Sequence, residues 1–151
     1  MKNTKYTIGI YFDSKLNKVA LILKNRPEWQ RGLYNFPGGH IEENETPEEC
    51  IAREFKEECL VNTNPEEWTQ IGAIRGNDYT VNMLLCVQKE EHGELLTGED
   101  QPVFWKWIHG IPDNCIENVH WITYYALNIQ TQRMNNKNCE VLKLNNSFYY
   151  H

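Results

Sequence analysis

The fold of this protein is decided by residues 36–61, FPGGHIEENETPEECIAREFKEECLV, which read as a glycine turn, an acidic loop and a helix. Thr46 is a good helix N-cap, Pro47 suits the first helical position and Glu49 completes a capping box, so we expect the helix to begin at Pro47. At about 100° per residue, three carboxylates share one sector of its surface: Glu54, Glu57 and Glu58. The adjacent sector is apolar and should pack on a core; it holds Ile51, Ala52, Phe55 and Cys59.

A cluster of carboxylates on one helix face needs a physical reason. Glu54 and Glu58 are like charges four residues apart, which cost an isolated helix a few tenths of a kcal/mol. A hard divalent cation such as Mg²⁺ or Mn²⁺ turns this cost into a gain, because it prefers carboxylate oxygens. In an arbitrary helix, a group of acidic side chains is most often a solvated surface. The spacing of the residues over the whole stretch 36–61 therefore has to distinguish this explanation from a metal site.

The spacing resembles the Nudix box, the signature of the Nudix hydrolases. That pattern runs Gly, five residues, Glu, seven residues, Arg-Glu, an apolar residue, any residue, Glu-Glu, two residues and an apolar residue. The chain matches it at Gly39, Glu45, Arg53, Glu54, Phe55, Glu57, Glu58 and Val61. The resemblance implies an α/β (α+β) Nudix fold, with a mixed β-sheet sandwiched between helices, in a single domain over residues 1–151.

Nudix hydrolases cleave phosphoric anhydride bonds in a nucleoside diphosphate linked to another group, and the resemblance implies this activity here. Such cleavage needs neutralised phosphate oxygens and a positioned, partly deprotonated water. By the same resemblance, Mg²⁺ (or Mn²⁺) is held by Glu54, Glu57 and Glu58, with the backbone carbonyl of Gly39 as a further ligand.

A weaker resemblance lies at residues 98–102, GEDQP, before an aromatic strand. It is similar to an acidic loop of the MutT-like branch, where a glutamate before Gln-Pro supplies an additional metal ligand or base. Glu99 is therefore a candidate metal ligand, and the general base stays open among Glu54, Glu57 and Glu99. The alternative for Glu99 is a surface position in an acidic loop. We expect this loop to be mobile without substrate.

Two further positions concern the geometry of the site. Arg53 and Glu45 are expected to form an ion pair that locks the loop against the helix and orients the ligands. The family pattern usually has Gly before its last residue, where this chain has Leu60. The left-handed conformation that ends a helix costs Leu about 1–2 kcal/mol. We therefore expect the helix to run slightly further, with Asn62 as its cap and Pro65 preventing continuation.

The loop at 25–34 follows a predicted central strand and begins with basic residues. Lys24 and Arg26 are candidate substrate-binding residues that would clamp phosphates, because they leave that strand shortly before the glycine turn; surface cations are the equal alternative. Trp29 either stacks on a base or caps the core. His40 has no His or Cys partner at zinc spacing, so we interpret it as a bystander. Cys59 is better explained as a packing residue than as a nucleophile.

The remaining patterns predict further strands and one more helix. Strands are expected at 5–12 (buried on one side), 19–23, 68–75, 79–89 and 103–109, with a hairpin turn at 76–78. Trp105 and Trp107 should both face the core. A helix is expected over 117–130, a turn at 135–138, an edge strand at 140–144 and a frayed or weakly packed end over 148–151.

Composition narrows the class of protein. With 151 residues, 40% of them hydrophobic, the chain has enough material for a globular core. The net charge of −6 gives no nonspecific attraction to nucleic acid or membrane, so we expect neither as a partner. The resemblance to the Nudix hydrolases implies a nucleotide as small-molecule partner. Five cysteines without a C-x-x-C pair, with no signal peptide or long apolar run, indicate a cytoplasmic protein with reduced thiols. Monomer and homodimer both stay open.

Three functions are compatible with the sequence. The first is a MutT-like pyrophosphohydrolase of nucleoside triphosphates, including oxidised ones such as 8-oxo-dGTP, with a monophosphate and pyrophosphate as products; Glu99 favours it. The second is a Nudix hydrolase of ADP-ribose, a nucleotide sugar, a dinucleoside polyphosphate or capped RNA. The third is a catalytically silent module that binds a nucleotide or a protein, which the complete set of box carboxylates disfavours.

Overall fold

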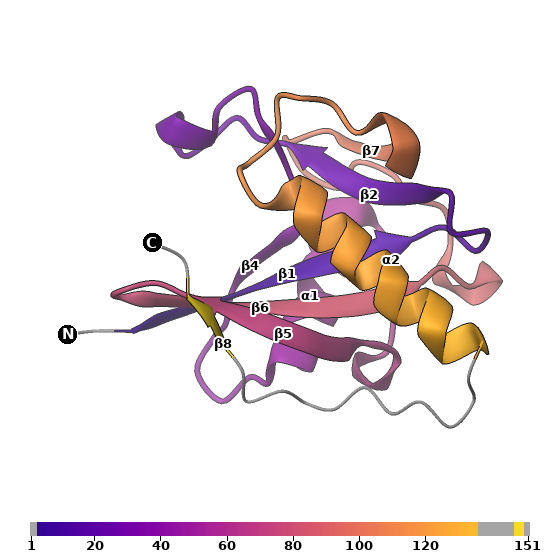
Figure 1. Ribbon diagram of the computed structural model, residues 1–151. Helices are drawn as coiled ribbons and strands as arrows, with labels where there is room; N and C mark the ends of the chain where they lie inside the picture. Colours follow the sequence, from indigo (N-terminus) through magenta and orange to yellow (C-terminus); the bar gives the residue numbers. More distant parts are fainter. Residues whose placement is uncertain (1–2, 136–146, 150–151) are drawn as a thin grey trace.

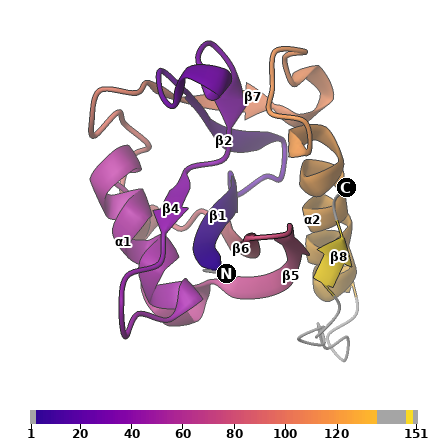
Figure 2. The same cartoon turned by 90° about the vertical axis from the view of Figure 1, so that its left-hand side faces the viewer.

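The computed structural model describes residues 3–135 and 147–149 and arranges them in three layers (Figures 1 and 2). A mixed β-sheet forms the middle layer, with helix α1 (Pro47–Cys59) on one face and helix α2 (Val119–Asn135) on the other. This confirms the expected fold class, a mixed sheet between helices. The strands are β1 (Thr4–Phe12), β2 (Lys18–Leu23), β3 (Tyr34–Asn35), β4 (Gly38–His40), β5 (Thr69–Arg75), β6 (Tyr79–Val87), β7 (Val103–Trp107) and β8 (Ser147–Tyr149).

Strand β1 organises the sheet. It pairs in parallel with β6 along its whole length, from Thr4 opposite Tyr79 to Phe12 opposite Val87. Its other edge is shared, because β4 pairs with the first half of β1 and β2 pairs with its end, both antiparallel. The predicted β5–β6 hairpin is present and antiparallel. Because one edge is shared, the glycine turn of β4 becomes part of the sheet.

The second half of β1 is buried on both faces. Ile10 and Phe12 belong to the core under α2, and Tyr11 belongs to the core under α1. All three side chains are fully buried. The prediction of a strand buried on one side is therefore wrong here, because a helix packs on each face of the sheet and every side chain meets apolar atoms.

Helix α1 begins as predicted. Thr46 Oγ1 accepts a hydrogen bond from the Glu49 N–H, and Glu49 Oε1 accepts one from the Thr46 N–H, each at 3.1 Å. Pro47 occupies the first helical position. The apolar sector docks on the core, where Ile51, Phe55 and Cys59 are fully buried.

The predicted end of α1 is wrong. Leu60 itself adopts the left-handed conformation, with φ 56° and ψ 28°, so Asn62 is not the cap. The N–H groups of Leu60 and Val61 both donate to the Phe55 carbonyl, the second at 3.3 Å, which closes the turn after the helix. Cys59 and Val61 are both fully buried, and this burial on either side of the exposed Leu60 offsets the strain of its backbone.

The two tryptophans of β7 have different environments. Trp105 stacks on Tyr11 with ring centroids 5.7 Å apart, beside the core under α1. Trp107 is 60% exposed, and its ring lies 4.5 Å from the Nζ of Lys18. The expectation that both rings face the core is correct for Trp105 only, because β7 extends past the cluster that Trp105 joins.

The end of the chain departs from the predicted pattern. Helix α2 begins at Val119 and continues to Asn135, five residues beyond the predicted end at Gln130. The predicted turn at 135–138 begins at Asn135, which belongs to α2; the rest of that turn and the predicted edge strand at 140–144 lie outside the described residues. Strand β8 pairs in parallel with β5, which contradicts fraying at Phe148 and Tyr149. None of the helices in the described residues is long and apolar enough to cross a membrane.

A buried histidine joins the loop at 88–102 to the body of the protein. His92 is fully buried, and its Nδ1 accepts the Lys89 N–H at 3.1 Å and lies 2.9 Å from the Tyr11 hydroxyl. Because Nδ1 is an acceptor, Nε2 carries the proton and donates to Glu67 Oε2 at 2.8 Å. The His92 carbonyl accepts the Asn62 N–H at 2.9 Å. This one residue therefore connects β1, the exit of α1 and the loop.

Glu67 should make the stability of the protein sensitive to acid. Burial raises the pKa of its carboxyl, but hydrogen bonds from Asn64, His92 and Lys89 outweigh burial and lower the pKa from 4.5 to about 2. Its contribution to stability is therefore present above pH 4.5 and is lost as pH falls from 4.5 towards 2. Glu67→Gln should lower the free energy of unfolding at pH 7 by roughly 1–3 kcal/mol, the usual worth of hydrogen bonds to a charged group.

Urea unfolding at pH 7, 5 and 3 measures this contribution. The difference between wild type and Glu67→Gln should shrink at the lowest pH, whereas the exposed neighbour Glu66, changed to Gln, should behave like wild type throughout. A difference that is equal at all three pH values would show that the Glu67 charge does not matter.

Candidate active site

The turn that contains β4 approaches its neighbours closely at two glycines, at Gly38 the backbone of β1 and at Gly39 the side chain of Glu54. A Cβ on Gly38 would lie 2.1 Å from the Thr7 carbonyl oxygen, and one on Gly39 would lie 2.5 Å from Glu54 Oε1. The pairing of β4 with β1 causes the first contact and the packing of α1 causes the second. The two glycines thus bring backbone atoms directly against the carboxylates of the helix.

Glu58 and Glu54 form the buried part of the carboxylate sector. Glu58 is 6% exposed, and its Oε1 accepts the Gly38 N–H at 3.0 Å. Burial, followed by the nearby charge of Glu54, raises the pKa of Glu58 to about 8. Burial also raises the pKa of Glu54, although Arg53 opposes that rise. Both carboxyl groups thus lack the solvation that would normally keep them charged.

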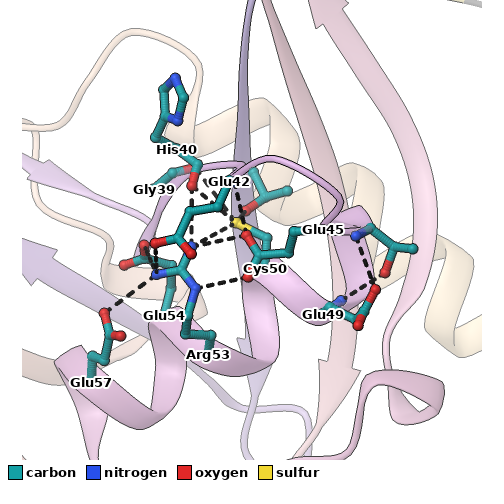
Figure 3. A network of polar contacts seen from close by, with 11 residues as sticks. Gly39, His40, Glu42, Glu45, Glu49, Cys50, Arg53, Glu54 and Glu57 are labelled. Atoms are coloured by element: carbon teal, nitrogen blue, oxygen red, sulfur yellow. Dashed lines mark hydrogen bonds and ion pairs between the residues drawn. The ribbon is translucent and has the colours of Figure 1, made fainter.

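Arg53 is the centre of the polar network on this face (Figure 3). Its Nε and Nη2 atoms donate to the two oxygens of Glu45 at 2.8 and 3.0 Å, so the expected ion pair is present and bidentate. The Arg53 hydrogen bonds lower the pKa of Glu45 to about 2. Nη1 donates to Glu54 at 2.8 Å, and Nη2 donates to the His40 carbonyl at 3.2 Å. His40, interpreted above as a bystander, therefore belongs to the Arg53 network through its backbone carbonyl.

The donors on this face suit a hard divalent cation. The Glu54 and Glu58 carboxylates and the Gly39 backbone supply oxygen atoms, and a cation between the two buried carboxyls would relieve their repulsion. Glu57 is only partly in place, since its carboxylate is half exposed and lies 3.5 Å from Arg53 Nη1. Within the described residues, no three acidic, histidine or cysteine side chains already surround one position suited to a metal. The predicted set of ligands is therefore partly assembled.

Glu99 lies beside this site, in a loop that is attached to α1. The Gly98 N–H donates to the Glu58 carbonyl at 2.8 Å, and a Cβ on Gly98 would lie 2.1 Å from the Glu57 carbonyl oxygen. Glu99 is exposed and close enough for its charge to act on Glu58. Leu96 also donates to the carbonyl of Cys59, so the loop is attached to the end of α1 at two points, and its mobility without substrate stays a prediction. These bonds satisfy carbonyls at the end of α1.

The two candidate phosphate-binding cations differ in their surroundings. Lys24 is half-buried and lines a cavity; burial lowers its pKa, against the opposite effect of Glu58. Arg26 is exposed and forms a bidentate ion pair with Asp100, at 2.6 and 3.0 Å. Lys24 therefore lies at the site, whereas the guanidinium of Arg26 binds Asp100.

The cavity that Lys24 lines has a volume of about 670 Å³ and is bounded by the glycine turn, β1, β6 and the start of α2. Sequence reasoning did not identify most of its wall. Aromatic and amide side chains from distant segments line it: Tyr6, Trp29, Gln30, Asn35, Tyr79 and Asn118. Trp29 is 69% exposed, so it does not cap the core. The pairing register that places Tyr6 beside His40 and Val81 creates this wall, and local patterns carry no signal for it.

Comparison with known proteins identifies one family. The family model described as NUDIX domain matches residues 4–143. The chain is 28% identical over 90 residues to an NAD-capped RNA hydrolase NudC of Stutzerimonas stutzeri (strain A1501), covering 59% of this chain and 32% of that protein. It is 37% identical over 57 residues to an 8-oxo-dGTP diphosphatase of Proteus vulgaris, covering 38% of this chain and 50% of that protein. The matches thus span a third to a half of these relatives.

Solved structures share the fold at low sequence identity. A MutT structure described for Aliivibrio salmonicida and Vibrio cholerae aligns with a TM-score of 0.71 and 20% identity, covering 85% of this chain and 99% of that one. A bifunctional NMN adenylyltransferase/ADP ribose pyrophosphatase of Francisella tularensis, complexed with AMP and a Mn ion, aligns with a TM-score of 0.64 and 18% identity. That alignment covers 85% of this chain and 42% of that chain.

Arg53 should be sensitive even to a conservative change. Lysine cannot reproduce the planar contact with Glu45 while also reaching Glu54. We expect Arg53→Lys to lower metal affinity or activity by roughly 10–100-fold, the usual effect of removing a group that orients ligands. Isothermal titration with Mn²⁺ and steady-state kinetics measure the two quantities. Lys56→Arg, an exposed change on the same helix, is the control, and unchanged values for Arg53→Lys would leave this residue as an ordinary surface cation.

Proposed function

Because the chain belongs to the NUDIX family, we propose that it is a metal-dependent pyrophosphohydrolase of nucleoside triphosphates, oxidised ones such as 8-oxo-dGTP included. The proposed products are a nucleoside monophosphate and pyrophosphate. One observation carries the proposal: the nucleoside-sized cavity and the buried carboxylates share a wall. Gly38 and Gly39 line the cavity, and the same two residues contact Glu58 and Glu54.

The cavity is suited to the nucleoside part of the substrate. Its volume lies in the range of small-molecule sites, and its wall combines aromatic rings with a few amides. Asn118 Oδ1 accepts a hydrogen bond from Trp121 at 2.7 Å, which orients the amide nitrogen as a donor. Lys24, between the cavity and Glu58, would contact the phosphates. A substrate with its base in the cavity would thus present its phosphates to the carboxylate sector.

The reaction can be assigned to this chain's own residues. Glu54, Glu57 and Glu58, with the Gly39 carbonyl, would hold Mg²⁺ (or Mn²⁺), which when bound would neutralise phosphate oxygens and acidify a coordinated water. A carboxylate not occupied in this way, Glu54, Glu57 or Glu99, would accept the proton of the attacking water. Arg53 would keep Glu45 and Glu54 in place throughout.

A second candidate substrate class is favoured by one comparison. The relative named as an NAD-capped RNA hydrolase covers more of this chain than the 8-oxo-dGTP diphosphatase does. An assay over a panel that contains dGTP, 8-oxo-dGTP, ADP-ribose, a dinucleoside polyphosphate and NAD-capped RNA separates the candidates. Pyrophosphate release confined to the triphosphates supports the proposal. Faster cleavage of another substrate would replace it, and no turnover with any metal would indicate a silent module.

Activity should depend on metal through the carboxylates of α1. We expect chelator to abolish turnover and millimolar Mg²⁺ or Mn²⁺ to restore it. Glu57→Gln and Glu58→Gln should each lower kcat by about 100-fold or more. Neither change should reduce thermal stability strongly, because removing a carboxylate relieves repulsion. Glu48→Gln, in the first turn of the same helix, is the control. Near wild-type rates in both variants would disprove the metal cluster.

Trp29 should affect binding of the nucleotide and not the chemical step. An exposed ring on the cavity wall can stack on a base, and such stacking is worth about 1–3 kcal/mol. Trp29→Ala should therefore raise KM by about 5- to 100-fold with little change in kcat. Trp107→Ala is the matched control, since that ring is similarly exposed on β7 but does not line the cavity. Equal KM values in both variants would place the base elsewhere.

A further inference from the structure

Two loops that are distant in sequence meet at a single ion pair. One loop, 25–33, follows β2 and carries part of the cavity wall; the other, 88–102, carries Glu99. Arg26 Nη1 lies 2.6 Å from Asp100 Oδ2, and Nη2 lies 3.0 Å from Oδ1. This contact is bidentate, the geometry in which a guanidinium fixes the orientation of a carboxylate. We call it the Arg26–Asp100 bridge.

The bridge does not stand alone. The Asn25 N–H donates to Gln101 Oε1 at 2.9 Å, and Gln101 is nearly buried. The Asn25 amide also donates to the Asp100 carbonyl at 3.3 Å, and its Oδ1 accepts from Arg26 at 2.9 Å. An isolated ion pair between exposed side chains contributes little to stability. The additional hydrogen bonds of Asn25, however, restrict the backbone on both sides of the bridge. The bridge therefore has a defined geometry.

Glu99 lies between two fixed neighbours. On one side, Gly98 is bonded to the end of α1 through the Glu58 carbonyl, at a contact that leaves no room for a side chain. On the other side, Asp100 is held by Arg26. The charge of Glu99 acts on both Glu58 and Arg26, so Glu99 lies near both the carboxylate sector and the bridge. Any movement of Asp100 must be transmitted to Glu99 through one peptide bond.

We propose that Arg26 is a positioning residue that acts through Asp100 to hold Glu99 at the active site. This role differs from the phosphate clamp that the sequence suggests, because the Arg26 guanidinium already binds a carboxylate of the protein. It rests on the proposed function, in which Glu99 accepts a proton or binds metal. A group of this kind loses much of its effect when it is displaced by about 1 Å.

The two roles of Arg26 predict different kinetics. A phosphate clamp contacts the substrate, so its loss raises KM and does not depend on Asp100. A positioning residue that acts through Asp100 lowers kcat, and loss of either partner has the same effect. We therefore compare Arg26→Gln, Asp100→Asn and the double variant. Two neighbours provide matched controls, the exposed Arg31 and Glu94, each changed to Gln.

We expect Arg26→Gln and Asp100→Asn each to lower kcat by about 10-fold, with KM within about threefold of wild type. The double variant should be no slower than either single variant. Glu99→Gln should lower kcat by about 10²–10⁴, the usual worth of a positioned proton acceptor. Adding Arg26→Gln to Glu99→Gln should then lower kcat no further. If Arg26→Gln acted by a general loss of structure, it would lower kcat in this background as well. Arg31→Gln and Glu94→Gln should match wild type.

Hydrogen exchange of a peptide covering residues 95–102 provides a readout that does not require turnover. Exchange should rise to the same extent in Arg26→Gln and Asp100→Asn and stay unchanged in Arg31→Gln. The proposal is overturned by unchanged exchange, by additive losses in the double variant, by a rise in KM confined to Arg26→Gln, or by a further loss in the Glu99→Gln background. If exchange rises in Arg26→Gln and Asp100→Asn but the wild-type protein cleaves no nucleotide, the proposed function is overturned while the bridge stays in place.

Discussion

The active-site face depends on how closely the turn of β4 approaches α1. A Cβ on Gly38 would meet the Thr7 carbonyl of β1 and one on Gly39 would meet the Glu54 side chain, and at this turn the Gly38 N–H donates to the carboxylate of Glu58. The approach is imposed by the sheet, because β4 pairs with β1 while α1 packs on β1 from one face. The carboxylate of Glu58, which would be solvated on an isolated helix, is thereby buried, and burial raises its pKa.

The charge distribution that results is unfavourable without a cation. Arg53 is engaged by Glu45 and Glu54, and Lys24 is a cation whose charge acts on Glu58. Such an arrangement lowers the stability of the fold in return for oxygen donors that are partly in place. It is typical of a binding site, since a purely structural face would let these carboxylates point to water. The apolar half of α1 supplies the packing that keeps them in place.

The loop at 88–102 is a long irregular segment that is attached to the rest of the protein at several points. Its first part is fixed by the buried His92, which bonds to Glu67 and lies against Tyr11. Its middle lies on the end of α1, where Leu96 and Gly98 donate to helix carbonyls that would otherwise lack partners. The left-handed Leu60 ends the helix early enough to expose those carbonyls to the loop. Strain at one residue thus creates the surface that holds Glu99.

The sequence by itself determined the helix α1, its capping box, the order of its carboxylates and the family to which they belong. These features are local: Thr46 and Glu49 lie three residues apart, and the Nudix box spans a single continuous stretch. Helical periodicity also predicted the buried side of α1. The sandwich fold followed from the resemblance to the family. Apolar patterns and the turn signal predicted β1, β2, β5, β6, β7 and the hairpin turn, whereas the short strands β3, β4 and β8 were not predicted.

Only the tertiary structure decided the surroundings of the site. The cavity wall at Tyr6 and Tyr79 depends on strand register, and the partner of Arg26 lies 74 residues away at Asp100. Whether Leu60 could adopt a left-handed conformation depended on burial of its neighbours and on contacts with a distant loop. These outcomes arise from long-range pairing and burial, whose free energies exceed local preferences and leave no pattern in neighbouring residues.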